Sequence, residues 1–417
     1  MSKPLIIDCF AGGGGASTGI EMALGRDVDI AINHDPEAIK MHKVNHPETL
    51  HLTEDIFKVD LEGLVQNEDV ALMWGSPDCR SFSKAKGSQP RSVSVRMLPW
   101  SIYKHSKAIK PKVIIMENVE EIQDWGPLDS EGRIIKERMG EEYNRFINSM
   151  KSLGYDYDCR ELIAADYGAP TTRKRWYAIF RRDGKPIVWP TQTHSKDGSD
   201  GLEKWISCDR FIDWSDLGAS IANRKKGLAK STVDRINKGI EKFVMNNPYI
   251  VTDKRAYDYI ENYYKVNNDT IAASFITKYY HTGVGQPLTS PIHTITTSSG
   301  HFGVVTAFLI KYYGAGGGQS VSDPVATITT KDRFGLVSGV IEIEGEKYIL
   351  KDIFLRMLKP EELKLMQGFP SDYIIDRTID WKPYPLSEQT ARIGNSVVPI
   401  MAKALVTANC PDLIVTA

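Results

Sequence analysis

Residues 70–83 read VALMWGSPDCRSFS, and this stretch decides the predicted fold. Its first five residues form an apolar run that predicts a buried strand, and Gly75 and Pro77 then end that strand. Cys79 follows in the loop just past the carboxyl end of the strand. Open α/β sheets place their chemistry at the carboxyl ends of parallel strands. The stretch therefore predicts a parallel sheet with a candidate nucleophile at its functional edge.

Two interpretations of Cys79 stand side by side at this point. Most cysteines act as small apolar core residues, and a lone loop cysteine is weak support for catalysis. Arg80, Lys84 and Lys86 lie close by in the sequence, and nearby positive charge favours the thiolate, which is the nucleophilic form. The choice between a core residue and a nucleophile depends on the rest of the chain.

Apolar runs and helical segments alternate on both sides of this stretch. A glycine turn at 11–17 follows the first apolar run, and a proline opens the helix expected at 36–45. Strands separated by helices connect through right-handed crossovers and build a doubly wound, mostly parallel sheet. We therefore expect an α/β fold with strands at 5–10, 28–33, near 51, 70–74, 113–116, 155–163 and 176–180, and helices at 18–24, 36–45 and 143–153.

Length and composition narrow the class of protein. The chain has 417 residues, which predicts two or three domains, and it has no apolar run near the ~20 residues of a membrane span. The first residues lead directly into a strand, so we expect no signal peptide and a cytoplasmic protein. Five scattered cysteines without CxxC pairs fit a reducing compartment and predict no metal site. Because the net charge is only −1, a nucleic-acid surface would have to be local.

The regular alternation ends after about residue 186. Tryptophans, short polar runs and turn residues follow, and helical texture returns at 359–367 and 400–408. We therefore divide the chain into a first domain at 1–188, a second, smaller β-rich domain at 189–350, and a return to the first domain at 351–417. Seven basic and two acidic residues lie between 224 and 242. Taken alone, this excess of basic residues fits a solvated helix face.

An internal repeat marks the second domain. Residues 275–280, FITKYY, return as FLIKYY at 308–313, and PIHTITT at 291–297 returns as PVATITT at 324–330. The offset is 33 residues and falls to 32 at the end. Two copies, at 275–305 and 308–337, are too few for a solenoid, and their β-branched runs and glycine turns predict two similar strand-and-loop units. Duplication for stability alone is the alternative explanation.

The glycine turn after the first strand favours a nucleoside ligand. Glycines let a backbone approach a ligand closely, but the turn lacks the third glycine of the pyrophosphate-binding pattern G-x-G-x-x-G. S-adenosylmethionine is one nucleoside without pyrophosphate. Asn33 ends the second strand, where such sheets hold a ribose, and His34 and Asp55 are placed to contact an adenine. Glu117 ends the strand beside the Cys79 loop, and a buried glutamate needs a partner or a function.

Seven motifs occur in order along nearly the whole chain. They are DCFAGGGG at 8–15, EDI at 54–56, GSPDCRSFS at 75–83, MENV at 116–119, TTRKR at 171–175, RMLKPEELKLMQGFP at 356–370 and RIGNSVVP at 392–399. With these motifs the chain resembles the DNA (cytosine-5)-methyltransferase family, of the bacterial or phage type. Chance agreement over so many ordered motifs is negligible, and the resemblance favours Cys79 as the nucleophile.

The resemblance implies a sequence-specific enzyme that transfers a methyl group from S-adenosylmethionine to C5 of a cytosine flipped out of double-stranded DNA. Cys79 would attack C6 and form a covalent adduct, and Glu117 would engage N3 and the exocyclic amine. Arg175 would contact O2, and Arg173 would support the site or the phosphate. We expect a monomer that acts in DNA methylation within a restriction-modification system.

The resemblance also implies cofactor-binding and DNA-binding residues. The segment 189–350 lies where the family carries target recognition, so the basic run would hold phosphates, and loops 314–319 and 329–334 would face the major groove. The loop 80–99 is similar to the mobile loop that closes over the flipped base. The cofactor pocket would be lined by Phe10, Gly12, Gly14, Asn33, His34, Asp55, Ile56, Pro77, Leu98, Asn395, Ser396 and Val397. The residues implied to contact DNA are Arg80, Ser83, Lys331 and Arg333.

Four residues depart from the family pattern. Asp78 and Arg80 flank Cys79 where the family has proline and glutamine, and Asn33 and Thr171 stand in place of a glutamate and a glutamine. A carboxylate beside the thiol raises its pKa and a guanidinium lowers it, so we expect the effects of Asp78 and Arg80 to cancel.

Two alternative functions stay open. One is a methyltransferase that modifies cytosine in RNA, although the long recognition segment favours duplex DNA. The other is a catalytically silent DNA-binding protein with a degenerate methyltransferase body. Intact Cys79, Glu117 and Arg175 favour an active enzyme.

Overall fold

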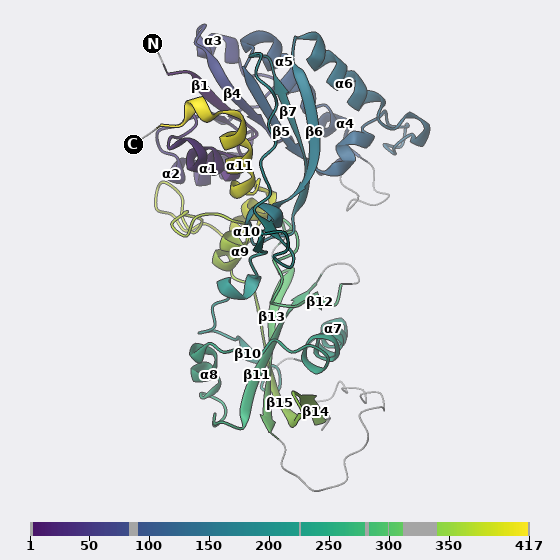
Figure 1. Ribbon diagram of the computed structural model, residues 1–417, viewed down its shortest axis with the longest axis vertical. Coiled ribbons are helices and arrows are strands. Elements are labelled where there is room, and N and C mark those ends of the chain that lie inside the picture. Colours follow the sequence, from purple (N-terminus) through teal and green to yellow (C-terminus); the bar gives the residue numbers. More distant parts are fainter. Residues whose placement is uncertain are drawn as a thin grey trace. The chain divides into compact units, whose positions relative to one another are not determined.

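The computed structural model describes residues 3–82, 91–224, 227–279, 283–298, 300–311 and 340–415, and it divides the chain into two compact units (Figure 1). Unit 1 comprises Met1–Ile206, Ile292–Thr297 and Lys364–Ala417, and unit 2 comprises Ser207–Pro291 and Ser298–Leu363. The unit boundaries fall later in the chain than residues 189 and 350, where the sequence texture changes. Residues 189–206 stay with unit 1 because Trp189 Nε1 donates to Asp158 and Trp205 Nε1 donates to Asp166.

Unit 1 is built on a sheet whose described strands number seven, in the order β3-β2-β1-β4-β5-β7-β6. Neighbouring strands from β3 to β5 pair in parallel, whereas β7 runs antiparallel to both β5 and β6. This sheet confirms the predicted α/β, mostly parallel class. The strands are β1 (Leu5–Cys9), β2 (Ile30–Ile32), β3 (Leu50–Leu52), β4 (Val70–Gly75), β5 (Val113–Asn118), β6 (Asp156–Ile163) and β7 (Lys174–Arg181), with a small pair, β8 (His194–Ser195) and β9 (Glu203–Lys204), outside the sheet.

Alternate residues of the strands pack against helices on opposite faces of the sheet (Figure 1). Ile6 and Leu72 lie in a core with α1 (Gly15–Leu24) and α11 (Pro399–Asn409). Ile7 and Met73 lie in a second core with α3 (Leu61–Val65), α5 (Pro99–Ile109) and α6 (Glu141–Ser152). The central strands are therefore buried on both faces, as expected for a doubly wound sheet. Unit 1 also contains α2 (Pro36–Asn45), α4 (Val93–Arg96) and α10 (Leu386–Asn395).

Besides the short helices α3 and α4, two longer helices of unit 1, α5 and α10, are absent from the sequence prediction. Both bury polar residues, which interrupt the apolar stripe that predicts a helix. In α5 the buried face includes His105, whose Nε2 lies 2.8 Å from Ile56 O, and Ser106, whose hydroxyl donates to Ile102 O. In α10 the buried residues include Gln389 and Thr390.

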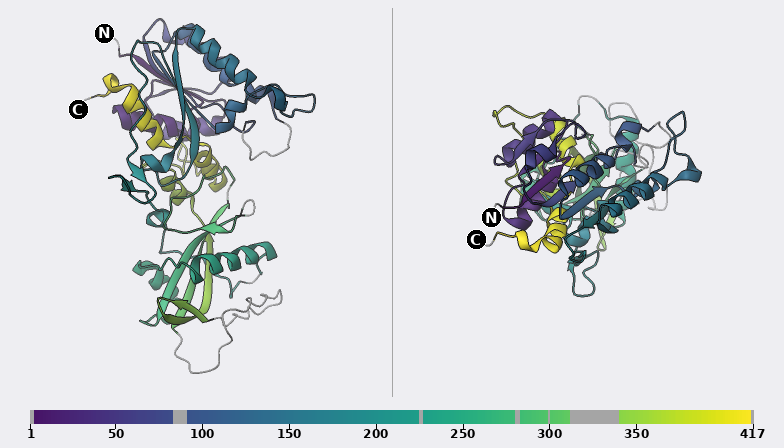
Figure 2. Two further views of the ribbon diagram at one scale, coloured as in Figure 1. Left: turned by 45° about the vertical axis from the view of Figure 1, so that its right-hand side comes forward. Right: turned by 90° about the horizontal axis from the view of Figure 1, so that it is seen from above.

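Unit 2 contains a second sheet with the order β10-β15-β13-β11-β12, and β14 pairs with β15. Its neighbouring strands are antiparallel. Helix α7 (Lys230–Ile240) packs its apolar residues against β11 and continues into a π-helical turn at Glu241–Met245 (Figure 2). The remaining elements are β10 (Ala219–Ser220), β11 (Thr270–Lys278), β12 (Gly285–Gln286), β13 (Phe302–Lys311), β14 (Val340–Ile343), β15 (Glu346–Met357), α8 (Lys254–Ile260) and α9 (Pro360–Met366), which crosses the unit boundary.

The internal repeat maps onto paired strands. The first copy begins in β11 and ends in β13, and the second copy begins in the same strand β13. Because β11 and β13 are antiparallel neighbours, the first copy folds back on itself, with Phe275 opposite Val305. Phe308, the first residue of the second copy, lies opposite Ala272, which precedes the first copy. Most of the second copy, from residue 312 to its end, lies outside the described residues.

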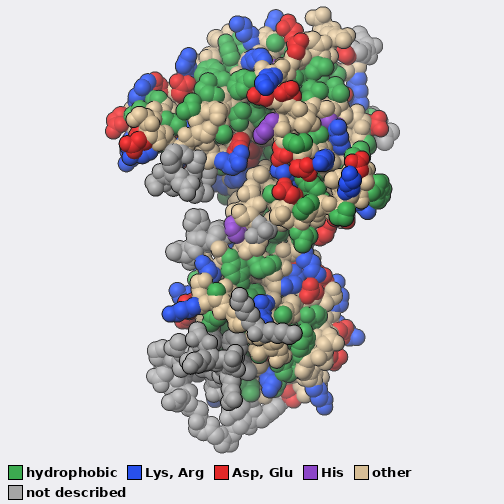
Figure 3. Space-filling model, turned by 180° about the vertical axis from the view of Figure 1, so that it is seen from behind, with side chains coloured by type: hydrophobic (Ala, Val, Ile, Leu, Met, Phe, Trp, Pro, Cys, Tyr) green, Lys and Arg blue, Asp and Glu red, His purple; other side chains and the backbone are tan. Residues whose placement is uncertain are grey.

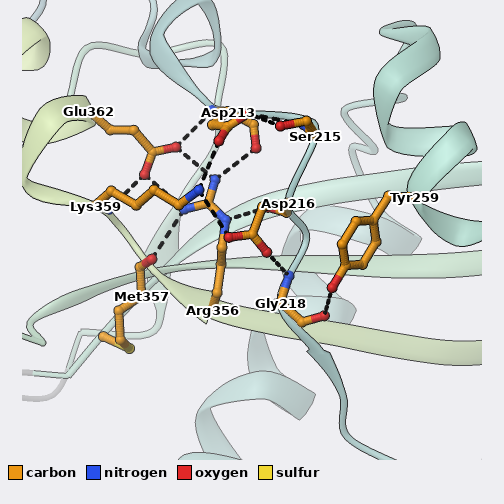
Figure 4. A network of polar contacts seen from close by, with 9 residues as sticks. All are labelled: Asp213, Ser215, Asp216, Gly218, Tyr259, Arg356, Met357, Lys359 and Glu362. Carbon is orange, nitrogen blue, oxygen red and sulfur yellow. Dashed lines mark hydrogen bonds and ion pairs between the residues drawn. The ribbon is translucent and has the colours of Figure 1, made fainter.

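An ion-pair network around the buried pair Arg356–Glu362 holds the end of β15 in unit 2 (Figure 4). The Arg356 guanidinium donates to both carboxylate oxygens of Glu362, at 2.7 and 2.8 Å. Arg356 also donates to the backbone oxygens of Asp213 and Asp216. Lys359 Nζ lies 2.8 Å from Asp213 and 3.0 Å from Asp216. The network ties residues 213–216 to the segment that leads from β15 into α9.

Hydrophobic length, surface charge and thiol state bear on the partners of the chain. No helix within the described ranges is long and apolar enough to cross a membrane. Acidic and basic side chains are interspersed over the face shown in Figure 3. The five cysteines are free thiols.

Candidate active site

Cys79 lies in the loop after β4, which hydrogen bonds from the two neighbouring strands hold in place. Ser76 N donates to the carbonyl of Cys9 in β1 at 3.4 Å. Asn118 Nδ2, at the end of β5, donates to Pro77 O at 2.9 Å. Since β1, β4 and β5 are parallel, the Cys79 loop sits at the carboxyl edge of the sheet, where the sequence pattern predicted it.

Glu117, Arg173 and Arg175 lie close enough to Cys79 to influence its charge. Glu117 Oε1 is 3.2 Å from Arg175 Nε and 3.9 Å from Arg173 Nη2. The three side chains are 9%, 13% and 5% exposed, in the order Glu117, Arg175, Arg173. Within the described part of the chain, Glu117 Oε1 and the Nε atoms of both arginines have no hydrogen-bond partner. Glu117 Oε1 and Arg175 Nε meet only as an ion pair, without a hydrogen bond. Because buried polar atoms without hydrogen bonds are costly, these atoms indicate a site that receives a polar ligand.

Burial is the largest influence on the Cys79 thiol, and it raises the pKa of that group. The positive charge of Arg175 partly offsets burial, whereas Glu117 adds to it. Arg80 has little influence on the thiol, because its guanidinium pairs with another group and lies in solvent. Its Nε donates to Asp78 Oδ2 at 2.7 Å, and its side chain is 74% exposed. The effects of Asp78 and Arg80 on the pKa of Cys79, which we expected to cancel, are therefore smaller than the effects of burial and of Arg175.

A pocket of about 280 Å³ lies beside this loop, in unit 1. Aromatic and apolar side chains form part of its wall, and amide and carboxylate groups form the rest. Asp78 and Arg80, on either side of Cys79 in the sequence, both face it. The lining residues are Phe10, Ile32, Asn33, His34, Glu54, Asp55, Ile56, Asp78, Arg80, Ser94, Val95 and Leu98.

Half of the residues implied for the cofactor pocket line this cavity. They are Phe10, Asn33, His34, Asp55, Ile56 and Leu98. The other six, Gly12, Gly14, Pro77, Asn395, Ser396 and Val397, are not among its lining residues. Of the lining residues, Ile32, Glu54, Asp78, Arg80, Ser94 and Val95 were not predicted for the cofactor.

The glycine turn before α1 is packed against the C-terminal segment of the chain. A Cβ on Gly15 would lie 2.2 Å from Val397 O and 2.9 Å from Ser396 Cβ. Gly14 has φ +92°, and a Cβ there would lie 2.2 Å from Tyr373 Oη. This close approach explains why the turn needs glycine, and it confirms that the C-terminal segment packs beside the first strand.

The comparison with known families decides the assignment. The model of the C-5 cytosine-specific DNA methylase family matches residues 5–409. The chain belongs to this family. Membership confirms the family and enzyme class predicted from the motifs, DNA (cytosine-5)-methyltransferase, and the dependence on S-adenosylmethionine.

Individual members of the methylase family are similar to this chain over part of its length. Type II methyltransferase M.AquIA from Picosynechococcus is 28% identical over 46% of this chain and 78% of its own length. Type II methyltransferase M.XorII from Xanthomonas oryzae is 30% identical over 46% of this chain and 44% of its own length. For most of these curated relatives the chain spans about half of their length. The crystal structure of S. pombe Dnmt2 methyltransferase has the same fold, with a TM-score of 0.54, 14% identity and 99% coverage of both chains.

The methylase site contains a positioning residue, Arg96, that the motifs did not reveal. Arg96 is buried, and its guanidinium donates to Ser81 O at 3.2 Å and to Gly126 O at 2.9 Å, which supports the far end of the Cys79 loop. Burial lowers the pKa of Arg96 to about 10. An arginine at a distance of 17 residues from Cys79 carries no sequence signal for this contact, because the contact forms only when α4 packs on the loop.

A segment of the repeat, residues 292–297, belongs to unit 1 and reaches the methylase site. Thr172 N donates to Ile292 O, and Ile292 N donates to Pro170 O, both at 2.9 Å. A Cβ on Gly394 would lie 2.4 Å from Thr296 O. Arg173 Nη1 donates to Gly394 O at 3.1 Å, so the segment packs directly behind the arginines of the site.

The residues predicted to contact DNA are only partly described. Arg80 is exposed and paired with Asp78. Ser83, Lys331 and Arg333 lie outside the described residues, as do loops 314–319 and 329–334. Of loop 80–99, residues 80–82 and 91–99 are described.

One group of side chains in the described part of the methylase could hold a metal ion: Glu21, Asp27 and His46. His46 Nε2 lies 3.2 Å from Thr18 Oγ1, whose own hydroxyl donates to Gly14 O. His46 must therefore donate from Nε2 and also faces Asp27 at 2.8 Å through Nδ1. Burial opposes the charged form of His46, but its hydrogen bonds to Asp27 and Glu21 raise its pKa. We interpret the group as a charged histidine held by two carboxylates.

Proposed function

We propose that this protein methylates C5 of cytosine in double-stranded DNA with Cys79 as its covalent nucleophile. The observation that carries the proposal is the cluster of Cys79, Glu117 and Arg175. In this cluster the buried Glu117 Oε1 and Arg175 Nε form an ion pair at 3.2 Å, and neither makes a hydrogen bond among the described residues. Such atoms suit the polar edge of one base. A stacked base cannot reach them, so the target must be flipped out of the duplex.

The chemistry follows from the position of these groups. The Cys79 thiolate attacks C6 of the cytosine and makes C5 nucleophilic. Glu117, in its protonated form, donates to N3 and accepts from the exocyclic amine, and Arg175 donates to O2. Both therefore stabilise the negative charge that develops on the ring. C5 takes the methyl group, loses its proton, and the returning electron pair expels Cys79. Arg173 positions the site through Gly394.

The pocket beside Cys79 fits a nucleoside donor. S-adenosylmethionine supplies the methyl group when it is bound. Phe10 and His34 offer faces for an adenine, Asn33 offers an amide for the ribose, and Asp55 offers a carboxylate for the adenine amino group. These side chains orient the donor and exclude water from the methyl group.

We propose unit 2 as the region that recognises the DNA sequence. Lys230, Lys238 and Lys242 are exposed on α7 and the turn after it, and they suit phosphate contacts. Ser83, Lys331 and Arg333 are proposed DNA contacts from segments outside the described residues. We further propose a monomer that works in a restriction-modification system, in the cytoplasm where its DNA lies.

Covalent trapping tests the proposed nucleophile. Wild-type protein mixed with S-adenosylmethionine and a duplex that carries 5-fluorocytosine should form a stable protein–DNA adduct, because fluorine cannot leave C5 as a proton does. Cys79→Ala should abolish the adduct. Cys159→Ala removes a partly buried thiol in β6 and should retain it. The absence of an adduct with wild type would contradict an active enzyme and favour a silent DNA-binding protein, and adducts with RNA alone would contradict the DNA substrate.

Sequence reading by unit 2 needs a separate test. Bisulfite sequencing of DNA from cells that express the chain should show methylation at one defined sequence. Arg333→Ala should change the sequence preference, because arginine reads guanine at its major-groove edge. A uniform loss of methylation at all sites would contradict a base-reading role for Arg333.

A further inference from the structure

The pocket beside Cys79 has an excess of negative charge. Among its lining residues, all within the described ranges, Glu54, Asp55 and Asp78 contribute carboxylates and Arg80 contributes one guanidinium. The oxygens of Glu54 and Asp55 accept from backbone N–H groups at 2.8 and 3.0 Å. The pocket therefore favours a ligand with positive charge.

Asp78 and Arg80 make a local contact that recurs elsewhere in the chain. Asp78 Oδ1 accepts from Arg80 N at 2.8 Å, and Asp78 Oδ2 accepts from Arg80 Nε at 2.7 Å. Asp253 and Arg255, in unit 2, have the same spacing, with Arg255 N at 2.9 Å and Arg255 Nη2 at 2.7 Å from the carboxylate. The contact is thus a local one that any Asp and Arg two residues apart can make. What distinguishes Asp78 from Asp253 is that Asp78 lines the pocket.

Asp78 is less exposed than its partner Arg80, so its charge acts more strongly on a ligand in the pocket. Its side chain is 22% exposed, whereas that of Arg80 is 74% exposed. Water and salt screen an exposed charge more strongly than a partly buried one. The carboxylate therefore acts on a ligand in the pocket more strongly than the guanidinium that pairs with it.

We propose that Asp78 is a specificity-determining residue that makes the pocket prefer the positively charged sulfonium donor over its neutral thioether product. The inference rests on the proposed function, since it takes this pocket as the donor site. When the sulfonium gives up its methyl group, the sulfur keeps the bonding electron pair and loses its charge. The neutral product is then no longer attracted to Asp78, and the Asp78 carboxylate pairs with Arg80 alone. Such a preference aids product release after each transfer.

Equilibrium binding to the full chain without DNA tests this inference. Calorimetry with S-adenosylmethionine and with S-adenosylhomocysteine gives the ratio of the two Kd values. Asp78→Asn should lower the preference for the donor by roughly three- to tenfold, the effect of one partly screened charge. Arg80→Gln should raise the preference by up to about threefold, since an exposed charge is screened. Asp78→Glu should keep the wild-type ratio within about twofold because it keeps the charge.

The control is Asp253→Asn, which breaks the matching contact outside the pocket and should leave the ratio unchanged. If Asp78→Asn binds both ligands with the wild-type ratio, the inference is wrong and the proposed function stands. If it weakens both ligands by the same factor, Asp78 is a structural residue and the inference is again wrong. Binding of neither ligand by the wild-type chain would overturn both the donor pocket and the inference.

Discussion

At the scale of single residues, Cys79 is governed by groups that are distant in sequence. Its neighbours Asp78 and Arg80 pair with each other, while the positive charge that stabilises the thiolate comes mainly from Arg175, after burial has raised the pKa of the thiol. A buried thiol with a raised pKa reacts slowly until it is deprotonated. Within the proposed function, this restrains the nucleophile until a base fills the site.

The raised pKa predicts how Cys79 reacts with an alkylating reagent. Iodoacetamide should label it slowly at pH 7, and the rate should rise steeply toward pH 9 and above. Arg175→Gln removes the main offsetting charge, so the rate at pH 8.5 should fall by roughly two- to fivefold. Peptide mass spectrometry identifies the labelled cysteine, with Cys79→Ala as the blank. A faster rate in Arg175→Gln would contradict the electrostatic role given to Arg175.

A second residue prediction concerns Asp8, which lies fully buried in β1. Ser17 Oγ donates to Asp8 Oδ2 at 2.7 Å, and burial raises the pKa of Asp8 to about 7. An unfolded chain releases this proton near pH 4, so the folded protein holds an extra proton between about pH 4 and 7. Stability therefore falls as the pH rises through this window and is constant above it.

Asp8→Asn cannot ionise, so its stability relative to wild type should increase from pH 5 to pH 8. The change should be on the order of 2–4 kcal/mol, from the size of the pKa shift. Urea denaturation at each pH measures it. Asp129→Asn is the control, at a partly exposed carboxylate whose pKa is lowered by hydrogen bonds from Arg133, and it should show no such increase. A difference that is independent of pH would show that Asp8 does not titrate in this range.

At the scale of elements, the turn between β1 and α1 depends on space as well as on conformation. Gly14 has a positive φ and also lies against the buried Tyr373, whose hydroxyl donates to Gly13 O at 2.5 Å. Gly184 also has a positive φ, of +74°, but a Cβ there would meet nothing within 4 Å. A comparison of Gly14 with Gly184 therefore distinguishes the cost of backbone strain, which both positions have, from the cost of a steric clash, which only Gly14 has.

Gly184→Ala should therefore cost about 1–2 kcal/mol of unfolding free energy, the usual penalty of a left-handed conformation. Gly14→Ala adds a clash at 2.2 Å with Tyr373 and should cost at least about 2 kcal/mol more. Urea denaturation measures both variants. Combining Gly14→Ala with Tyr373→Phe should recover part of the difference, and equal costs for the two alanine variants would rule out the steric argument.

At the scale of the whole molecule, the chain crosses between two units several times, and each unit has its own stabilising core. Unit 2 relies on the Arg356–Glu362 pair, whose side chains are 8% and 4% exposed. Removing one partner of a buried pair leaves the other charge uncompensated, which costs about 3–5 kcal/mol. Arg356 also donates to the backbone of Asp213 and Asp216, so the loss of its position would destabilise the chain segment before β10 as well.

Glu362→Gln should consequently destabilise unit 2 by about 3 kcal/mol. Hydrogen–deuterium exchange should show the loss of protection in β13 and β15, whereas β1 and β4 of unit 1 keep theirs. The matched control is Glu141→Gln, which breaks an exposed pair with Arg138 and should leave the protection of both units unchanged, because water screens an exposed pair. Unchanged protection in β13 and β15 would contradict the role of the network.

Much of the fold is predictable from local patterns. Strands β1, β4 and β5 are apolar runs that end in turn residues, and α2 begins at Pro36 with a cap from Asp35, so both classes carry a short-range signal. Helices α5 and α10 bury polar residues, which hides their apolar stripe. The antiparallel insertion of β7 between β5 and β6 also has no local signal, because strand order depends on long-range pairing.

The sequence by itself determined the α/β class, the ordered motifs of the methylase family and the place of Cys79 after a buried strand. These features depend on spacing along the chain, which the sequence states directly. Only the tertiary structure decided which charges face Cys79, that residues 292–297 pack behind Arg173, and that Asp78 lines the pocket. Those facts depend on side-chain direction and on the pairing of distant segments, which packing sets and spacing does not.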